Sequence, residues 1–209
     1  MSILVKNVGL YQNGKVTEKK NIEIEGKYIK GFPENPLLEN YDEVIDGKGM
    51  LALPGLVNTH THVAMTLFRS YADDLALMDW LQNKIWPVEE HLDDDIVYWG
   101  SMLAFAEMIR GGTTAFSDMY MFMDSCAQAA DTAGIRGNLA RGLAGVTPNG
   151  DRALEENIEL FHKWNGAGDG RFKVMLGPHA PYTCPSAYIK KVRDAGEKYG
   201  IPIHSYFFY

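Results

Sequence analysis

The chain has 209 residues, of which 46% are hydrophobic and 22% charged, and its formal net charge is −7 at pH 7. This composition is typical of a globular protein with a sizeable core, and the acidic balance argues against nucleic-acid or anionic-membrane partners. No stretch is apolar over a membrane-spanning length, and residues 1–11 show no secretion signal. Two cysteines far apart, Cys126 and Cys184, favour a reducing, cytoplasmic location without a disulfide framework.

The first 50 residues predict a small β-unit. Its expected strands cover residues 2–5, 21–25, 28–30 and 43–46. Asn13-Gly14 and Glu25-Gly26-Lys27 are typical of hairpin turns, and residues 32–42, rich in Pro, Asn and Glu, predict a loop.

Strands and helices alternate in the rest of the chain. Strands are expected to start near residues 51, 113, 137, 172 and 201. Helical spacing and helix-ending glycines predict helices over residues 93–110, 126–133, 152–163 and 186–199. Repeated strand-then-helix units predict an α/β fold with parallel strands.

The run Pro54–His62, PGLVNTHTH, predicts a buried strand that ends in two histidines. Side chains at i and i+2 of a strand point to the same face, so His60 and His62 project together. Two imidazoles on one side can share a metal ion. An ordinary pair of polar residues at a strand end is the alternative.

This run resembles the first metal motif of the amidohydrolase superfamily. Ala64–Arg69 (AMTLFR) and Asp79–Glu89 (DWLQNKIWPVE) make the chain similar to the 5'-methylthioadenosine/S-adenosylhomocysteine deaminase branch, close to the chlorohydrolase-type deaminases. The resemblance implies a (β/α)8 TIM-type barrel and a small β-sandwich domain built from both ends of the chain. A closed barrel alone takes about 250 residues. We therefore expect residues 1–53 to be the N-terminal part of the β-domain, and residues 54–209 to be the first four to five β/α units of the barrel, truncated in the fifth strand.

The resemblance implies that His60 and His62 bind a divalent metal, with zinc first and iron second. Such a metal lowers the pKa of a bound water and makes a hydroxide nucleophile near neutral pH. Asp118 ends the second barrel strand, where we expect it to hydrogen-bond its neighbours rather than bind metal.

The end of the chain departs from the family pattern, which places a third metal histidine on the fifth strand and a proton-shuttling glutamate three residues later. In one register the histidine falls on Tyr206 and the glutamate on Tyr209. In the other register His204 is the metal ligand and Phe207 takes the glutamate position. The general acid/base glutamate and the metal-binding aspartate of the eighth strand are therefore absent. Two explanations of this tail remain: a truncated or frameshifted sequence, or a real, shortened protein that is not catalytic.

The resemblance assigns four further residues to substrate binding. His179 would donate a hydrogen bond to the nucleoside, and Glu89 would accept from the two ribose hydroxyls. Arg141 and Arg152 would reach the amino-acid carboxylate of S-adenosylhomocysteine, one of them across the interface of a homo-oligomer; the arginine fork suits a carboxylate. The residues alone also allow plainer roles: a loop histidine for His179, a solvated surface residue for Glu89, and surface ion pairs for the two arginines.

Together these observations predict a fragment of a metal-dependent hydrolytic deaminase that acts on an adenine nucleoside thioether and is inactive as written. Among enzymes, a related guanine, cytosine or triazine amidohydrolase is the alternative; Glu89 with Arg141 favours a ribosyl substrate that bears a carboxylate. A non-catalytic metal-binding or interaction module is the alternative from another class. We expect Glu89, Arg141 and His179 to converge on the barrel mouth that holds the histidine pair.

Overall fold

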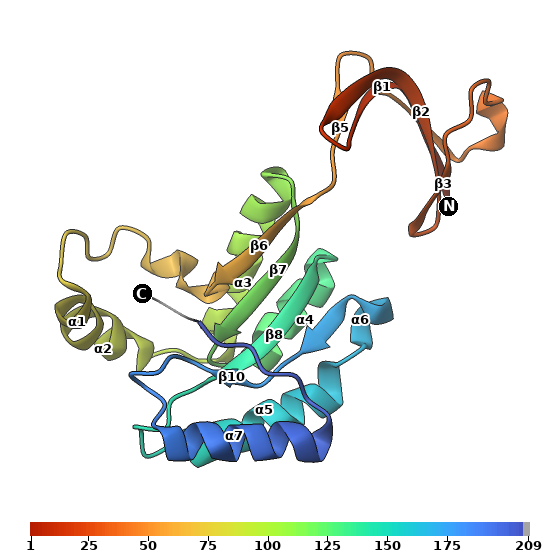
Figure 1. Cartoon of the computed structure of the whole chain (residues 1–209). Coiled ribbons are helices and arrows are strands. Elements are labelled where there is room, and N and C mark those ends of the chain that lie inside the picture. Colours follow the sequence, from red (N-terminus) through yellow and green to blue (C-terminus); the bar gives the residue numbers. More distant parts are fainter. Residues whose placement is uncertain (207–209) are drawn as a thin grey trace. The chain divides into compact units, whose positions relative to one another are not determined.

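The computed structural model describes residues 1–206 and all of their side chains except that of Glu18. It contains two compact units, of which the first is Met1–Pro54 and the second begins at Gly55. Each unit is described by itself below, and Figure 1 labels most of the elements of both.

The first unit is a five-stranded sheet with the strand order β3-β2-β1-β4, and β5 lies beside β1. Its strands are β1 (Ser2–Gln12), β2 (Lys15–Glu25), β3 (Tyr28–Gly31), β4 (Glu43–Asp46) and β5 (Leu51–Ala52). β1 and β2 form the predicted antiparallel hairpin. Its turn residues Asn13 and Gly14 both have positive φ, which these residue types tolerate. Leu4, Val8 and Ile22 are its buried core.

The apolar stretch near residue 51 does not begin the second architecture, so that prediction is wrong. β5 pairs in parallel with Gly9 and Leu10 of β1, and the second sheet starts only at β6 (Leu56–Thr61). A short apolar run carries no information about its pairing partner, which is why periodicity alone misplaced this one.

The second sheet has the strand order β10-β8-β7-β6 with β9 beside β8, and every pair is parallel. Its remaining strands are β7 (Thr113–Tyr120), β8 (Arg136–Leu143), β9 (Phe172–Val174) and β10 (Gly177–Pro178). The strand expected over residues 201–204 is reduced to one parallel bridge between Leu176 and Ile203. Because all strands run in one direction, their carboxyl ends meet at the same edge of the sheet.

The helices follow the strands as the sequence predicts. They are α1 (Leu77–Trp80), α2 (Trp86–Glu89), α3 (Asp94–Arg110), α4 (Met123–Ala133), α5 (Gly150–Trp164), α6 (Ala167–Gly170) and α7 (Ser186–Tyr199), with short turns at Leu38–Asn40, Val63–Phe68 and Leu81–Ile85. The Asp93 carboxylate caps α3 by accepting from the Ile96 N–H at 2.8 Å. Gly134 and Gly200 end α4 and α7 in the left-handed conformation. Within residues 1–206, no helix combines the length and apolarity needed to cross a membrane.

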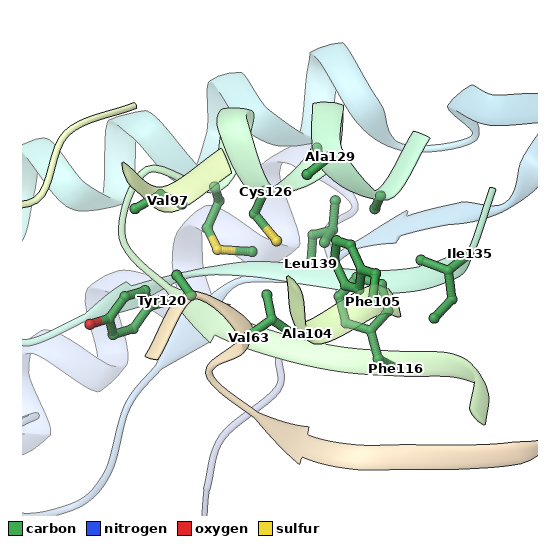
Figure 2. Packing of buried hydrophobic residues seen from close by; sticks show 14 of the residues in the cluster. Val63, Val97, Ala104, Phe105, Phe116, Tyr120, Cys126, Ala129, Ile135 and Leu139 are labelled. Carbon is green, nitrogen blue, oxygen red and sulfur yellow. The ribbon is translucent and has the colours of Figure 1, made fainter. Parts of the chain in front are cut away.

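The core of the second unit lies between the sheet and the helices α3 and α4. Figure 2 shows Phe105 of α3 packed with Phe116 of β7 and Leu139 of β8, and all three are at most 2% exposed. A second cluster, centred on Leu143 and Val192, lies under α5 and α7. Rigid packing on this side fixes the strands whose carboxyl ends carry the candidate site.

β6 differs from its prediction as a buried strand. Leu56 and Val57 are 60% and 62% exposed. β6 is the edge strand of its sheet and pairs only with β7 among the described residues. Burial of a strand depends on its neighbours, and the sequence of the strand does not reveal whether they are present.

Candidate functional site

The two histidines of the PGLVNTHTH run lie together at the carboxyl end of β6. Their ring centroids are 5.6 Å apart and the rings are nearly perpendicular. Two imidazoles that bind one tetrahedral zinc at about 2.1 Å have ring centroids about 5 Å apart. The spacing of His60 and His62 is therefore compatible with two ligands of one metal ion.

His62 is oriented by the backbone of the neighbouring strand. Its Nδ1 lies 2.7 Å from the carbonyl oxygen of Met119 in β7. A carbonyl only accepts, so Nδ1 carries the proton and Nε2 keeps its lone pair, as in a metal-binding histidine. Burial is the main cause that lowers the pKa of His62, which also favours the neutral ring.

Asp118 hydrogen-bonds the backbone next to the histidine pair, as the sequence predicts. It is fully buried; one carboxylate oxygen accepts from the Val63 N–H at 3.3 Å, and the other lies 3.6 Å from the Cys126 thiol. Burial raises the pKa of Asp118 to about 7. Because Val63 follows His62 directly, this hydrogen bond fixes the backbone on which the imidazole stands.

Tyr206 occupies the space beside the histidine pair. Its ring stacks on His60 with centroids 3.6 Å apart and an interplanar angle of 15°, and it meets His62 edge-on at 5.6 Å. Its hydroxyl donates to the Thr61 carbonyl at 3.3 Å, and the residue is only 5% exposed. Its backbone N–H donates to the carbonyl of His179 at 3.2 Å, which places Tyr206 at the level of the strand ends.

His204 lies two residues earlier, opposite the middle of the strands. Its backbone N–H donates to the Leu176 carbonyl at 2.9 Å. Its ring Nδ1 lies 3.1 Å from the Ser117 hydroxyl and 3.5 Å from the Asn138 amide nitrogen. Across residues 1–206, no three His, Cys, Asp or Glu side chains gather closely enough to hold a metal ion. The described residues therefore fit two ligands of a metal but do not fit a complete site, and His204 as the third ligand stays a prediction.

A cavity of about 680 Å³ is lined by Glu89, Arg141 and Arg152. The Tyr120 hydroxyl donates to the Glu89 carboxylate at 2.6 Å, and the Tyr120 ring lies 5.7 Å from that of His62. Burial raises the pKa of Glu89. Tyr120 thus connects the histidine pair to Glu89, a role that sequence reasoning missed because a lone tyrosine at a strand end carries no distinctive spacing.

The two predicted carboxylate-binding arginines hold one carboxylate of the chain itself. Arg141 Nε lies 2.9 Å from one oxygen of Glu156, and Arg152 Nε lies 3.1 Å from the other. The Arg141 side chain is 20% exposed and that of Arg152 80% exposed. Sequence reasoning missed Glu156, although its place one helical turn after Arg152 was an available signal.

His179 follows β10 at the same edge of the sheet. An added Cβ on Gly177 would stand 2.7 Å from the Arg141 carbonyl oxygen, so glycine permits the close approach of β10 to β8. The His179 Nδ1 lies 3.1 Å from the Thr183 hydroxyl. Burial, followed by the charge of His60, lowers the pKa of His179. The structure therefore brings Glu89, Arg141 and His179 to the edge that holds the histidine pair.

The model of the amidohydrolase family matches residues 51–205. The chain belongs to the amidohydrolase family. Solved structures agree with this: the chain has a TM-score of 0.87 and 29% identity to an adenosine deaminase from Xanthomonas campestris with bound zinc, covering 98% of this chain and 48% of that one. A guanine deaminase from C. acetobutylicum, at 18% identity and a TM-score of 0.83, shows the same fold. The predicted fold class, a partial TIM-type barrel preceded by a small β-unit, is confirmed.

Two curated relatives are each named 5-methylthioadenosine/S-adenosylhomocysteine deaminase. The protein from Dictyoglomus turgidum is 48% identical over 206 residues, which are 99% of this chain and 48% of the relative. The protein from Desulforudis audaxviator is 57% identical over 182 residues, which are 86% of this chain and 42% of the relative. The chain thus spans about half the length of the curated relatives that it matches.

Proposed function

We propose that this chain forms the first half of a hydrolytic deaminase that acts on an adenine nucleoside thioether, methylthioadenosine or S-adenosylhomocysteine. The observation that carries the proposal is the cavity in which two arginines already hold a carboxylate and which the half-buried Glu89 also lines. Residues 1–53 would be the N-terminal part of the small β-domain and residues 54–209 half of the barrel. The names of the curated relatives support this substrate class.

Glu89 is the residue that we assign to the ribose. Its carboxylate is half-buried, and the Tyr120 hydroxyl holds one of its oxygens at 2.6 Å. A carboxylate fixed in this way keeps acceptor sites for two vicinal hydroxyls. His179, placed at the same edge, would donate a hydrogen bond to the nucleoside.

Arg141 and Arg152 are the residues that we assign to the amino-acid carboxylate of S-adenosylhomocysteine. Their contacts with Glu156 demonstrate that both guanidinium groups reach one carboxylate from the cavity wall. A substrate carboxylate would compete with Glu156 for these donors. Because Arg152 is 80% exposed, it is the arginine that we assign to a subunit interface in a homo-oligomer.

We propose that His60 and His62 supply two ligands of a divalent metal, most readily zinc. A zinc ion held by these imidazoles together with further ligands would supply an activated water for hydrolysis. The described residues provide no complete ligand set, and position 209 is a tyrosine where one register expects the acid/base glutamate. We therefore propose that the chain as written does not deaminate nucleosides by itself, since acid–base help alone contributes about 10²–10⁴ in rate.

The test is the effect of Arg141→Ala on binding of the two nucleosides to the chain, measured by isothermal titration calorimetry. Hydrogen bonds to charged groups contribute about 1.5–3 kcal/mol, so S-adenosylhomocysteine should bind about 10- to 100-fold more weakly. Methylthioadenosine, which has no carboxylate, should be unaffected. Arg136→Ala, an exposed arginine at the other end of the same strand, is the matched control. Equal losses for both nucleosides would contradict the assignment.

A further inference from the structure

We infer that the described residues do not fit a complete zinc site because Tyr206 stands beside the histidine pair without supplying a ligand. His60 and His62 therefore bind zinc weakly, and exchange of the Tyr206 ring for an imidazole creates a three-histidine zinc site. The inference rests on the proposed role of the histidine pair and concerns the residue beside it. It follows from how Tyr206 stacks, where its hydroxyl points and at which level of the strands it lies.

The stacked geometry excludes Tyr206 as a ligand in its observed position. Lone pairs of an imidazole lie in the plane of the ring, so a metal bound to His60 lies in the plane of that ring. The Tyr206 ring is nearly parallel to His60, with its centroid 3.6 Å away. A ring in this pose covers one face of the imidazole and does not direct an atom toward the same metal at about 2.1 Å.

The hydroxyl of Tyr206 is committed elsewhere. It donates to the carbonyl oxygen of Thr61, the residue between the two histidines, at 3.3 Å. The hydrogen bond and the burial of the ring both hold Tyr206 over the histidine pair.

Tyr206, rather than His204, is the residue that stands at the carboxyl ends of the strands, where a third metal ligand would join His60 and His62. Its backbone N–H bonds to the His179 carbonyl at the strand ends, and its ring contacts both His60 and His62. His204 bonds to the Leu176 carbonyl below this level, and its ring faces Ser117. The rings of His204 and Tyr206 lie 5.0 Å apart, so an imidazole at position 206 would stand next to that of His204 and beside the pair.

Metal titrations of the chain and three variants test the inference. Tyr206→His should bind Zn²⁺ at least 10-fold more tightly than the wild-type chain, and its Co²⁺ complex should show the absorption bands of a tetrahedral site. Tyr206→Phe keeps the ring and loses only the hydroxyl, so its affinity should stay within about threefold of wild type. His60→Ala added to Tyr206→His should remove the gain. A wild-type chain as tight as Tyr206→His, or an equal gain in Tyr206→Phe, would overturn the inference.

A measurement on the wild-type chain keeps the inference testable if Tyr206→His does not fold. In nuclear Overhauser spectra, cross-peaks between the rings of His60 and Tyr206 should persist when Zn²⁺ is added in equimolar amount. Their absence in the metal-free chain would refute the placement of Tyr206 beside the histidine pair. The Arg141→Ala titration uses no metal and depends on the nucleosides alone. If Arg141→Ala has no selective effect on S-adenosylhomocysteine while Tyr206→His gains zinc affinity, the proposed substrate is rejected and this inference stands. If Arg141→Ala acts selectively and Tyr206→His gains no zinc affinity, this inference is rejected and the proposed substrate stands.

Discussion

Replacement of Glu156 by glutamine tests whether the arginine pair is held ready for a substrate carboxylate. In the structure each oxygen of Glu156 accepts from one guanidinium, at 2.9 Å from Arg141 and 3.1 Å from Arg152. The neutral amide keeps the size of the side chain and weakens its competition for both donors. We therefore expect Glu156→Gln to bind S-adenosylhomocysteine more tightly than the wild-type chain does.

The magnitude follows from the exposure of the two arginines. A hydrogen bond to a charged group contributes about 1.5–3 kcal/mol when partly buried, as for Arg141. The pair with Arg152 is solvent-exposed, and such pairs contribute about 0–1 kcal/mol. The arginine N–H groups still donate in part to the amide oxygen of the substituted side chain. We therefore expect the binding free energy of S-adenosylhomocysteine to improve by about 1–2 kcal/mol, roughly 5- to 30-fold in Kd.

Isothermal titration calorimetry with both nucleosides measures this effect. Methylthioadenosine lacks the carboxylate and should bind Glu156→Gln as it binds the wild-type chain. Glu159→Gln, which removes a charge from the same cavity wall, is the control for a general change of potential. If Glu156→Gln instead weakens S-adenosylhomocysteine selectively, Glu156 orients the arginines rather than competing for them, and the reasoning fails.

Two further predictions concern the residues around the histidine pair. The folded-state pKa of Asp118 is about 7, above its usual value of 3.8. Between pH 4 and pH 7 the folded state therefore holds more protons than the unfolded state, and the free energy of unfolding should fall by up to about 4 kcal/mol over this range. Asp118→Asn should remove that slope in urea titrations across this range; an unchanged slope would assign it to other groups. Tyr120→Phe loses the hydrogen bond to Glu89 and should weaken both nucleosides equally, about 3- to 10-fold. A selective loss of one nucleoside would show that Tyr120 does not act through Glu89.

Much of the secondary structure could be predicted because its signals are local. The turn at Asn13-Gly14 and the helix predicted over residues 93–110 depend on residues close together in the sequence, and both occur where expected. The common face of His60 and His62 follows from the period of a strand in the same way. Pairing is not local, which is why the run at Leu51–Ala52 was assigned to the wrong sheet.

The site could be predicted only as far as its residues follow recognisable patterns. Glu156 and Tyr120 lie in ordinary helix and strand-end contexts, and their roles emerge from distances to Arg141 and Glu89 that span 15 and 31 residues of sequence. The choice between His204 and Tyr206 also stayed open in the sequence. It depends on the bridge between Leu176 and Ile203, which sets the level of every residue after it.

The residues proposed for nucleoside binding and those proposed for metal binding are different side chains. The pairs Tyr120–Glu89 and Arg141–Glu156 each join a strand of the second sheet, β7 or β8, to a helix. The same two strands carry Phe116 and Leu139 of the core in Figure 2. The proposed metal site is incomplete in the described residues, and Tyr206 stacks on His60 beside it. Binding of S-adenosylhomocysteine by this chain should therefore respond to Arg141 and Glu156 and be indifferent to chelators. Zinc affinity should respond to position 206 and be indifferent to both of those residues.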